Sequence, residues 1–462
     1  MFGRTDSEIP IPVAVTGAGG EFGRTFLAQL RSIPAIQPTV LVDRDLRRLA
    51  RMLDELSYHE SYTECGSAAE VADAVRAGRI AITDRADTEL PEVFDVLVEA
   101  TGDLGAGFRY ARDAVAQGRH VVMVSKEVES VTGRWLARRA ADRDLRYIPG
   151  RGDQPANLCA LLAWTQWLGF EVVAAGKSSE YDVVFDPATG TASYLGTDLA
   201  VPRLAELLDA RTATRAVLES RGALLESLLR PVAADLCEIS VVSQRLGIAP
   251  DTHALHYPVA RINELADVYA MYADGGIMDT VPALDVFTVL RLPNEASFAG
   301  GVFVVVRAAD ATTWRVLADK GHVVSRSGSY ACLYLPYHLM GVETPLSVFD
   351  AAGRRPDGAP LPLSAQPGHL MHGRAQRELP AGHRFRVSGH HHQIDGVRPV
   401  LEADEGGMDV PFYLLDGATL RADHRQGDRL LIDDVDGLDG AVLQAFQESH
   451  GTSTGQINRE YL

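Results

Sequence analysis

The sequence predicts an α/β protein that begins with a doubly wound parallel sheet. Over residues 1–150, short apolar runs alternate with amphipathic segments. The apolar runs are continuous, which is typical of strands buried on both faces, and each amphipathic segment ends at a glycine or a polar turn. With 462 residues, the chain is too long for one core, so two or three domains are expected.

The first 150 residues divide into strands and helices that follow one another along the chain. Strands are expected at residues 11–17, 38–43, 79–84, 94–102, 120–127 and 146–150, and helices at 21–30, 46–56, 68–78, 108–118 and 133–144. Such a succession places the strands in one sheet with helices on both faces.

The pattern changes at residue 151, and an α+β domain is expected over residues 151–354. Its helices are expected at 156–170 and, as a pair, within 202–247, and its strands at 171–179, 286–292, 300–308 and 330–337. Residues 355–368 are rich in proline and glycine and suit a linker. A small β module is expected at 365–445, with two similar segments at 377–387 and 420–432, and then a flexible tail at 446–462.

Composition limits the partners that the chain can have. The formal net charge is −18 and the pI is about 5.2, which disfavours nucleic acid and anionic membranes because both need a basic surface. No apolar run reaches the roughly 20 residues that span a bilayer, no signal peptide is expected, and the four cysteines form no C-x-x-C pair. We therefore expect a cytoplasmic protein that acts on a small molecule, without a nucleic-acid or membrane partner.

A glycine-rich turn, AVTGAGGEFGR at 14–24, follows the first expected strand. A helix N-terminus after such a turn presents free backbone N–H groups to a pyrophosphate, so the turn predicts a dinucleotide-binding Rossmann domain. The spacing also fits the T-G-x-x-G-x-x-G of extended short-chain dehydrogenases, but the Tyr-x-x-x-Lys pair of those enzymes is absent. The predicted cofactor residues are Gly17, Gly19, Gly20, Glu21, Phe22, Gly23, Asp43, Arg44, Ala100, Thr101 and Gly102.

Asp43 bears on the choice between the two nicotinamide cofactors. It ends the second expected strand, where a carboxylate binds the ribose 2′-hydroxyl and repels a 2′-phosphate, and this favours NAD(H). Arg44, Arg47 and Arg48 stand nearby and would bind the phosphate of NADP(H), so that alternative stays open. Asp43 could instead cap the following helix.

Several blocks of the chain resemble one family, in the same order: EATGD at 99–103, HVVMVSKEVE at 120–129, GRGDQPANLCALL at 150–162, GFEVVAAGKSS at 169–179, DGGIMDTVPALDVF at 274–287 and YLPYHLMGVETPLSV at 334–348. The sequence is similar to the homoserine-dehydrogenase-like oxidoreductases with a C-terminal SAF domain, and in particular to the DXR-like (DRL) reductoisomerases. The resemblance runs from about residue 10 to residue 445. It implies a Rossmann domain, an α+β catalytic domain, a β-clip SAF module and a homo-oligomer.

The chain also departs from the DRL family. Ser179 and Thr280 stand where that family has lysines, and phosphate recognition favours lysine and arginine, so a phosphorylated substrate is less favoured. Lys126 is absent from the DRL family but matches a lysine of homoserine dehydrogenases. The differences imply a paralogue with its own substrate.

The candidates for the chemistry are Lys126, Asp153, Lys177, Glu238 and Asp285. Lys126, expected at a strand end, would polarise a carbonyl or exchange a proton, unless it is a surface lysine paired with Glu127 or Glu129. Asp153 would bind a substrate hydroxyl or cap a helix, and Lys177 would bind a carboxylate or phosphate or form a structural ion pair. Glu238 lies in an apolar helix, where it either occupies an exposed face or, as a buried carboxylate, needs a partner such as either lysine. Asp285 precedes an expected strand and either matches an acid of the DRL family or caps a loop.

A divalent metal is a further possibility. Asp153, Glu238 and Asp285 would suit Mg²⁺ or Mn²⁺, which prefer oxygen ligands, although the sequence does not show that the three converge. His256 and His338 could bind substrate, but they are interpreted as hydrogen-bonded core or loop histidines. Residues 390–392, three consecutive histidines, are interpreted as an exposed loop.

The sequence thus predicts an NAD(P)-dependent oxidoreductase that transfers a hydride to or from a small polar hydroxy or keto substrate. One alternative is 1-deoxy-D-xylulose 5-phosphate reductoisomerase activity with NADPH and a divalent metal. The other is a dinucleotide-binding regulator without catalysis.

Overall fold

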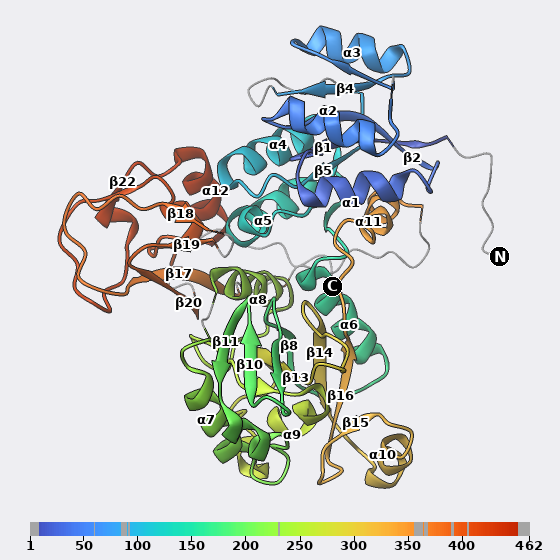
Figure 1. Ribbon diagram of the computed structural model, residues 1–462. Helices are drawn as coiled ribbons and strands as arrows, with labels where there is room; N and C mark the ends of the chain where they lie inside the picture. The colour runs from blue at the N-terminus through green and yellow to red at the C-terminus, as the bar shows by residue number, and fades with distance from the viewer. Residues whose placement is uncertain are drawn as a thin grey trace.

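The computed structural model describes residues 9–59, 61–84, 90, 93–229, 232–354, 364, 368–389, 392–403 and 406–450. It contains two large sheets and a small C-terminal β module (Figure 1). Helix α8 (Ala233–Leu246) lies where the three parts meet and contacts elements of each. Within the described part of the chain, no helix combines the length and the apolar character needed to cross a membrane.

The first sheet has seven parallel strands in the order β3-β4-β2-β1-β5-β6-β7. The strands are β1 Ile11–Thr16, β2 Ile36–Val42, β3 Tyr62–Glu64, β4 Ile80–Thr83, β5 Val96–Glu99, β6 His120–Met123 and β7 Tyr147–Pro149, and the helices are α1 Glu21–Leu30, α2 Leu46–Glu55, α3 Ala68–Arg76, α4 Leu104–Ala116 and α5 Lys126–Ala141. The strand order reverses between β1 and β5, so this is the predicted Rossmann sheet, with its ligand crevice expected at the carboxyl ends of those strands.

Two details of this sheet differ from the prediction. The short edge strand β3 was not predicted, because its three residues are half-buried or exposed and carry no continuous apolar run. Strand β6 ends at Met123 rather than at residue 127, and Ser125 is the N-cap of α5. Lys126 therefore begins a helix instead of ending a strand, although it stays at the carboxyl edge of the sheet.

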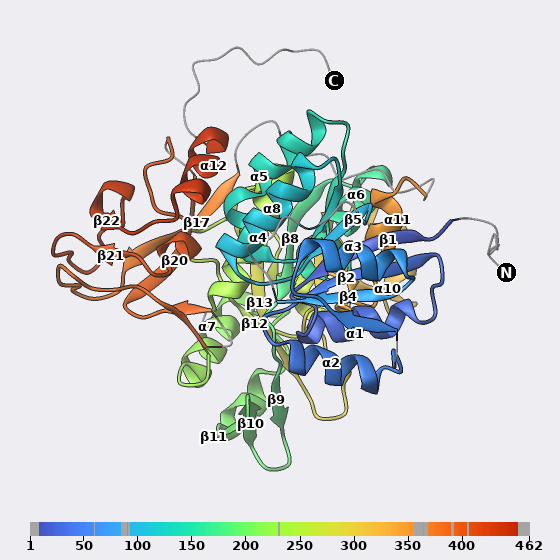
Figure 2. The same ribbon diagram turned by 90° about the horizontal axis from the view of Figure 1, so that it is seen from above.

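The second sheet is mixed, in the order β11-β10-β9-β13-β8-β14-β16-β15, with β12 paired to β13. Its strands are β8 Val172–Ser178, β9 Val183–Asp186, β10 Thr191–Tyr194, β11 Thr197–Ala200, β12 Val259–Ala260, β13 Ala283–Arg291, β14 Val302–Arg307, β15 Val323–Val324 and β16 Tyr330–Leu335. Helix α6 (Gln154–Trp167) packs on β8 and β14 beside α8. The hairpin of β10 and β11 was not predicted, and Figure 2 shows it extending away from the rest of the fold.

The remaining helices connect these parts. They are η1 Pro202–Leu207, α7 Thr214–Leu225, η2 Ile262–Glu264, α9 Leu265–Val268, η3 Tyr272–Asp274, α10 Ala311–Ala318 and α11 Thr344–Ala351. Helix α11 returns to the first sheet, where it packs on β6 and β7. The end of the predicted 151–354 segment thus shares its core with the first sheet.

The C-terminal module is built from short antiparallel strands. They are β17 His369–Ala375, β18 Val387–Ser388, β19 Gln393–Ile394, β20 Val397–Ala403, β21 Thr419–Leu420 and β22 Val435–Asp436, with η4 Phe412–Leu415 and η5 Ile432–Asp434. The two similar segments lie against each other through a bridge that pairs Leu379 with His424. A second bridge pairs Arg384 with Thr419, the residue just before the second segment. Most of the expected linker, 355–368, lies outside the described residues.

The chain ends its described part in helix α12 (Gly440–His450), which packs on α5. Phe446, Ser449 and His450 are buried. The predicted boundary between residues 445 and 446 therefore falls inside a helix, because the polar sequence after Phe446 still places two residues on the face toward α5. Residues 451–462 of the expected tail lie outside the described part.

Candidate active site

The glycine turn has the geometry that close approach to a phosphate requires. Gly17 has a φ of 70°, and a Cβ there would lie 2.2 Å from the carbonyl oxygen of Ala100. A Cβ on Gly23 would lie 2.0 Å from the carbonyl oxygen of Ala18. Helix α1 begins just after Gly20, its N-cap, which makes no side-chain capping bond. Its first backbone N–H groups are therefore available to an anion.

A cavity of about 160 Å³ opens beside this turn. It is lined by Gly17, Gly20, Val42, Asp43, Arg44, Arg48, Asp84, Ala100, Thr101, Asp103, Ala106 and Tyr110. The structure thus brings together six of the predicted cofactor residues from three strand ends. Of the others, Glu21 is exposed at the start of α1, Phe22 stacks on Phe26, and Gly102 lines a neighbouring cavity.

Asp43 is buried beneath the turn. Its carboxylate accepts hydrogen bonds from the backbone N–H groups of Gly19 (2.8 Å) and Asp45 (2.9 Å) and forms an ion pair with Arg48 (3.4 Å). The N-cap of α2 is Asp45 rather than Asp43, so the helix-cap alternative for Asp43 was wrong. Asp43 instead ties the glycine turn to the end of β2.

Glu99 is a site residue that the sequence analysis placed in a motif but did not assign. It is fully buried at the end of β5 and accepts hydrogen bonds from the backbone N–H (2.9 Å) and hydroxyl (2.6 Å) of Thr101. Burial raises the pKa of the Glu99 carboxyl. The Ser125 hydroxyl accepts from the N–H of Gly102 (2.8 Å). These bonds fix the 100–102 loop against the residue that precedes Lys126.

Lys126 and Lys177 meet at one carboxylate. The ammonium of Lys126 lies 2.5 Å from Oε1 of Glu238, and that of Lys177 binds Oε2. Lys177 also lies 2.5 Å from Oδ1 of Asp235, which is one helical turn before Glu238 on α8. The chain has only three lysines, and the third, Lys320, is exposed far along the sequence. Two of the three lysines therefore belong to one cluster.

Only one side of this cluster is accessible. The side chains of Lys177, Asp235 and Glu238 are 2–3% exposed, whereas that of Lys126 is 23% exposed. Burial opposes ionisation of Glu238, but the two ammonium groups outweigh it and lower its pKa to about 2. Burial likewise opposes the charge of Lys126, but Glu238 and Asp153 outweigh it and raise its pKa well above the usual value. Lys126 therefore presents a permanent positive charge at the accessible side.

Asp153 completes the cluster from the start of α6. It is the N-cap, as one alternative proposed, and its carboxylate accepts from the N–H of Gln154 (3.0 Å). With its amide oriented to satisfy both partners, Gln154 donates to Asp153 (3.1 Å) and to Glu238 (3.2 Å). Burial and the charge of Glu238 raise the pKa of Asp153, partly offset by Lys126. Asp153 is half-buried, so it combines a capping role with access to the site.

Asp285 does not join this cluster. On the paired strands β13 and β8, Asp285 stands opposite Gly176, and Val286 opposite Lys177. Because successive strand residues point to opposite faces, Asp285 and Lys177 face different sides of the sheet. The Asp285 carboxylate accepts from the N–H of His256 (2.8 Å), and burial raises its pKa to about 6. Among the described residues, no group of three His, Cys, Asp or Glu side chains is placed to hold a metal ion, so the predicted set of Asp153, Glu238 and Asp285 is not assembled.

Tyr257 and its loop were missed by the sequence analysis. The Tyr257 hydroxyl donates to Oδ2 of Asp235 (3.3 Å). Leu255 and Tyr257 both have positive φ angles, 60° and 47°, and flank His256, whose ring lies 2.9 Å from Asp251. His338 packs against Gly300. His392 was expected in an exposed loop, but it is half-buried and its Nδ1 lies 2.7 Å from Oε1 of Glu127. Residues 390 and 391 lie outside the described part.

A family model matches the central segment of the chain. Residues 152–344 match the family described as Oxidoreductase DRL, catalytic domain. No curated protein matches the chain.

Among solved structures, the chain is similar to three oxidoreductases at low identity. The 1-deoxy-D-xylulose 5-phosphate reductoisomerase from Zymomonas mobilis in complex with NADPH is 16% identical, with 51% of this chain and 57% of that chain covered and a TM-score of 0.30. An oxidoreductase from Agrobacterium radiobacter in complex with NAD⁺, L-tartaric acid and magnesium is 15% identical (38% and 46% covered, TM-score 0.28), and a dehydrogenase from Chromobacterium violaceum is 18% identical (42% and 49%, TM-score 0.28).

The chain thus spans about half the length of each of these structures. The matched family segment contains Asp153, Lys177 and Glu238, and the glycine turn lies in the sheet that precedes it. Over residues 152–344, the chain is similar to the catalytic domain of the oxidoreductase DRL family.

Proposed function

We propose that the chain is an NAD(P)-dependent oxidoreductase that transfers a hydride to or from a small polar hydroxy or keto compound. One observation carries the proposal. Ser125, whose hydroxyl holds the Gly102 N–H of the expected cofactor loop, directly precedes Lys126 of the charged cluster. The expected cofactor edge of the Rossmann sheet therefore lies next to the cluster of residues 126, 153, 177 and 238.

The nicotinamide, when bound, would supply or accept the hydride. Lys126 would donate a hydrogen bond to the substrate oxygen, where its fixed charge stabilises the alkoxide that develops during transfer. Asp153 would give or take the hydroxyl proton, because its raised pKa is closer to neutral pH than that of an ordinary aspartate. Its side chain is half-buried and so can reach the substrate. Glu238, whose other oxygen is bound by Lys177, would hold Lys126 in place.

The residues do not fit a divalent metal in this cluster. Both oxygens of Glu238 are bound by ammonium groups, and Asp285 faces the other side of the sheet. The position that a cation would take beside Glu238 is filled by Lys126 and Lys177. This favours simple hydride transfer over a reductoisomerase activity that requires a metal.

Asp43 supports NAD(H), while Arg44 and Arg48 in the same cavity keep NADP(H) open. The four cysteines are free and buried, which supports the proposal of a cytoplasmic location. Homo-oligomerisation is proposed from the family resemblance.

The test follows reduced-nicotinamide absorbance with NADH and NADPH in parallel. The substrates are 1-deoxy-D-xylulose 5-phosphate and a panel of keto acids and ketoses, each with and without EDTA. Turnover that is insensitive to EDTA and lost in Lys126→Met, but kept in Lys320→Met, supports the proposal. Turnover of the phosphorylated substrate only in the presence of Mg²⁺ would favour the reductoisomerase, and tight cofactor binding without turnover on any substrate would favour a regulator.

A further inference from the structure

The segment at residues 336–343, which follows strand β16, packs against two parts of the proposed site. A Cβ on Gly152, two residues before α6, would lie 2.5 Å from the carbonyl oxygen of Leu339. A Cβ on Gly341 would lie 2.9 Å from the carbonyl oxygen of Phe22 in α1. The segment therefore lies directly against the start of α6 and against the helix that follows the glycine turn.

His338 of this segment lies at the end of strand β8. Gly300 has a φ of 75°, and a Cβ there would lie 1.9 Å from Nδ1 of His338, so only a glycine leaves room for the ring. The next residue, Gly301, accepts a hydrogen bond from the N–H of Ser178 (2.9 Å). Because Ser178 follows Lys177, the ring lies beside the strand end that carries this lysine.

The two ring nitrogens of His338 differ in their surroundings. Nδ1 is buried and makes no hydrogen bond within the described part of the chain. Nε2 has no partner among these residues either, but it is not buried, and the residue as a whole is half-buried. An N–H group at Nδ1 would be buried without an acceptor, so the neutral ring carries its hydrogen on Nε2, as the protonated ring also does. Nε2 is therefore a donor that a ligand can reach.

Asp153 connects His338 to the charged cluster. Burial and the charge of Glu238 raise the pKa of Asp153, whereas the charges of Lys126 and of the protonated His338 ring lower it. Asp153 is thus close enough to both groups to sense their charges. This agrees with the contact between Gly152 and the segment that carries His338.

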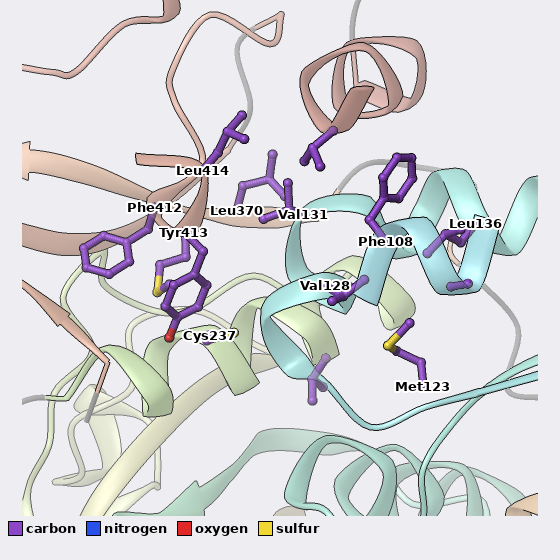
Figure 3. Packing of buried hydrophobic residues seen from close by; sticks show 14 of the residues in the cluster. Phe108, Met123, Val128, Val131, Leu136, Cys237, Leu370, Phe412, Tyr413 and Leu414 are labelled. Carbon is purple, nitrogen blue, oxygen red and sulfur yellow. The ribbon is translucent and has the colours of Figure 1, made fainter. Parts of the chain in front are cut away.

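Packed side chains close the cluster toward the C-terminal module. Figure 3 shows Tyr413 of η4 extending toward Cys237 of α8. The Cys237 thiol donates to the carbonyl oxygen of Lys126 (3.4 Å), and neither Cys237 nor Tyr413 is more than 4% exposed. A substrate that reaches the Lys126 ammonium therefore approaches from another side, and Asp153 and His338 are its half-buried, accessible neighbours.

We propose that His338 is a specificity residue of the reaction site, and that its Nε2–H donates a hydrogen bond to a second oxygen of the substrate. The inference rests on the proposed function, because that function assigns Lys126 and Asp153 to the reacting oxygen. Two donors that share one acid suit a compound with a further oxygen beside the reacting one. A simple ketone or alcohol would leave Nε2 without a partner.

The test is calorimetric titration of the full chain with two pairs of probes, in each of which a methyl group replaces a hydroxyl. Hydroxyacetone and 2-butanone are titrated in the presence of NAD⁺ or NADP⁺, and glycolate and propionate in the presence of NADH or NADPH, so that no hydride is transferred. We expect wild type to bind the hydroxylated member about fivefold more tightly, which corresponds to one ordinary hydrogen bond.

Two variants of His338 separate its two nitrogens. His338→Asn places an amide only near the position of Nδ1, against Gly300, and should lose the preference for the hydroxylated probe. His338→Gln places an amide near the position of Nε2 and should keep most of it. The matched control is His383→Asn in the C-terminal module, because His383 is also half-buried and has one buried ring nitrogen without a partner in the described part of the chain. This control should keep the full preference.

The proposal is overturned by equal binding of the two members of each pair in wild type, by an unchanged preference in His338→Asn, or by the same loss in His383→Asn. Absence of binding by all four probes would overturn it as well. Failure of the proposed function gives a different result, because wild type then binds neither cofactor. The same titrations on the cofactor-free protein then still compare each probe with its methyl counterpart.

Discussion

Lys126 and Lys177 bind the two oxygens of a single carboxylate, that of Glu238. Lys126 starts helix α5 beside the first sheet, and Lys177 lies on strand β8 of the second sheet. One buried anion thus holds two cations that would otherwise repel each other. The arrangement explains how a chain with three lysines can place two of them within one site. It also ties the start of α5, and with it the expected cofactor loop, to the second sheet.

Replacing Glu238 by Gln should therefore destabilise the protein and abolish turnover. The substitution leaves two buried ammonium groups with less compensation, and breaking a buried ion pair costs about 3–5 kcal/mol. Urea unfolding and initial rates measure the two effects. The control is Glu264→Gln, which breaks the buried pair with Arg221 (2.7 Å) outside the site. It should lose comparable stability and keep its turnover at a temperature where it remains folded; loss of turnover in both variants would contradict a specific role for Glu238.

The comparison of sequence and structure shows which parts of this site can be predicted. The strand ends that carry Gly17, Asp43 and Thr101 follow from continuous apolar runs, because a parallel sheet aligns its carboxyl ends at one edge. Asp235 could have been found from its position three residues before Glu238, since that spacing puts both carboxylates on one helix face.

Other parts of the site depend on long-range packing. Asp285 stands just before the expected strand at 286–292, but β13 begins at Ala283. With the strand start shifted, the face on which Asp285 lies could not be read from the alternation of residues. The contact of His392 with Glu127 joins residues 265 positions apart, and no local pattern carries such information.

Asp285 should make stability depend on pH. Its folded pKa is about 6, above the value of about 3.9 in an unfolded chain, so the folded state binds more protons between these values. The stabilisation is complete below pH 4 and is lost as the pH rises through 6. The Asp285→Asn variant does not lose stability in this way, and its amide oxygen still accepts the hydrogen bond from the His256 N–H. Relative to wild type, the variant should gain about 3 kcal/mol between pH 4 and 7.5, measured by urea unfolding.

The control for that measurement is Asp279→Asn, which changes an exposed carboxylate in the same region. It measures how far the loss of one negative charge in this region changes stability. A pH-independent difference for Asp285→Asn would show that the buried carboxyl does not titrate in this range.

Asp43 should set the cofactor preference. Wild type is expected to bind NADH more tightly than NADPH, and Asp43→Asn should weaken NADH binding about tenfold, which is about 1.4 kcal/mol, with little effect on NADPH. Fluorescence titration of both cofactors measures this. Arg47→Ala is the control, because Arg47 is exposed and does not line the cavity. Tighter binding of NADPH by wild type, lost in Arg48→Ala, would instead assign the cavity to the 2′-phosphate.

The last prediction concerns the strained loop at residues 255–257. Two residues with positive φ cost about 1–3 kcal/mol each, and such strain persists only where the surroundings impose it. Asp285 accepts from the backbone N–H of His256, and Asp251 contacts its ring, so His256 is fixed between the two carboxylates. This conformation places the Tyr257 hydroxyl where it donates to Asp235. That bond favours the ionised form of Asp235, whose pKa is raised by burial. Tyr257→Phe should raise this pKa further and weaken the hold on Lys177.

The expected consequence is a shift of the acid limb of the pH–rate profile upward by about 0.5–1 pH unit, with an unchanged KM for the cofactor. Tyr147→Phe, which removes a buried hydroxyl bound to Glu129, serves as the control: it should lose stability without moving the profile. Lysine ¹⁵Nζ NMR offers a second measurement, because a chain with three lysines gives only three signals. Tyr257→Phe should shift the Lys177 signal and leave that of Lys320 unchanged. An unchanged Lys177 signal together with an unmoved profile would mean that the loop serves only the fold.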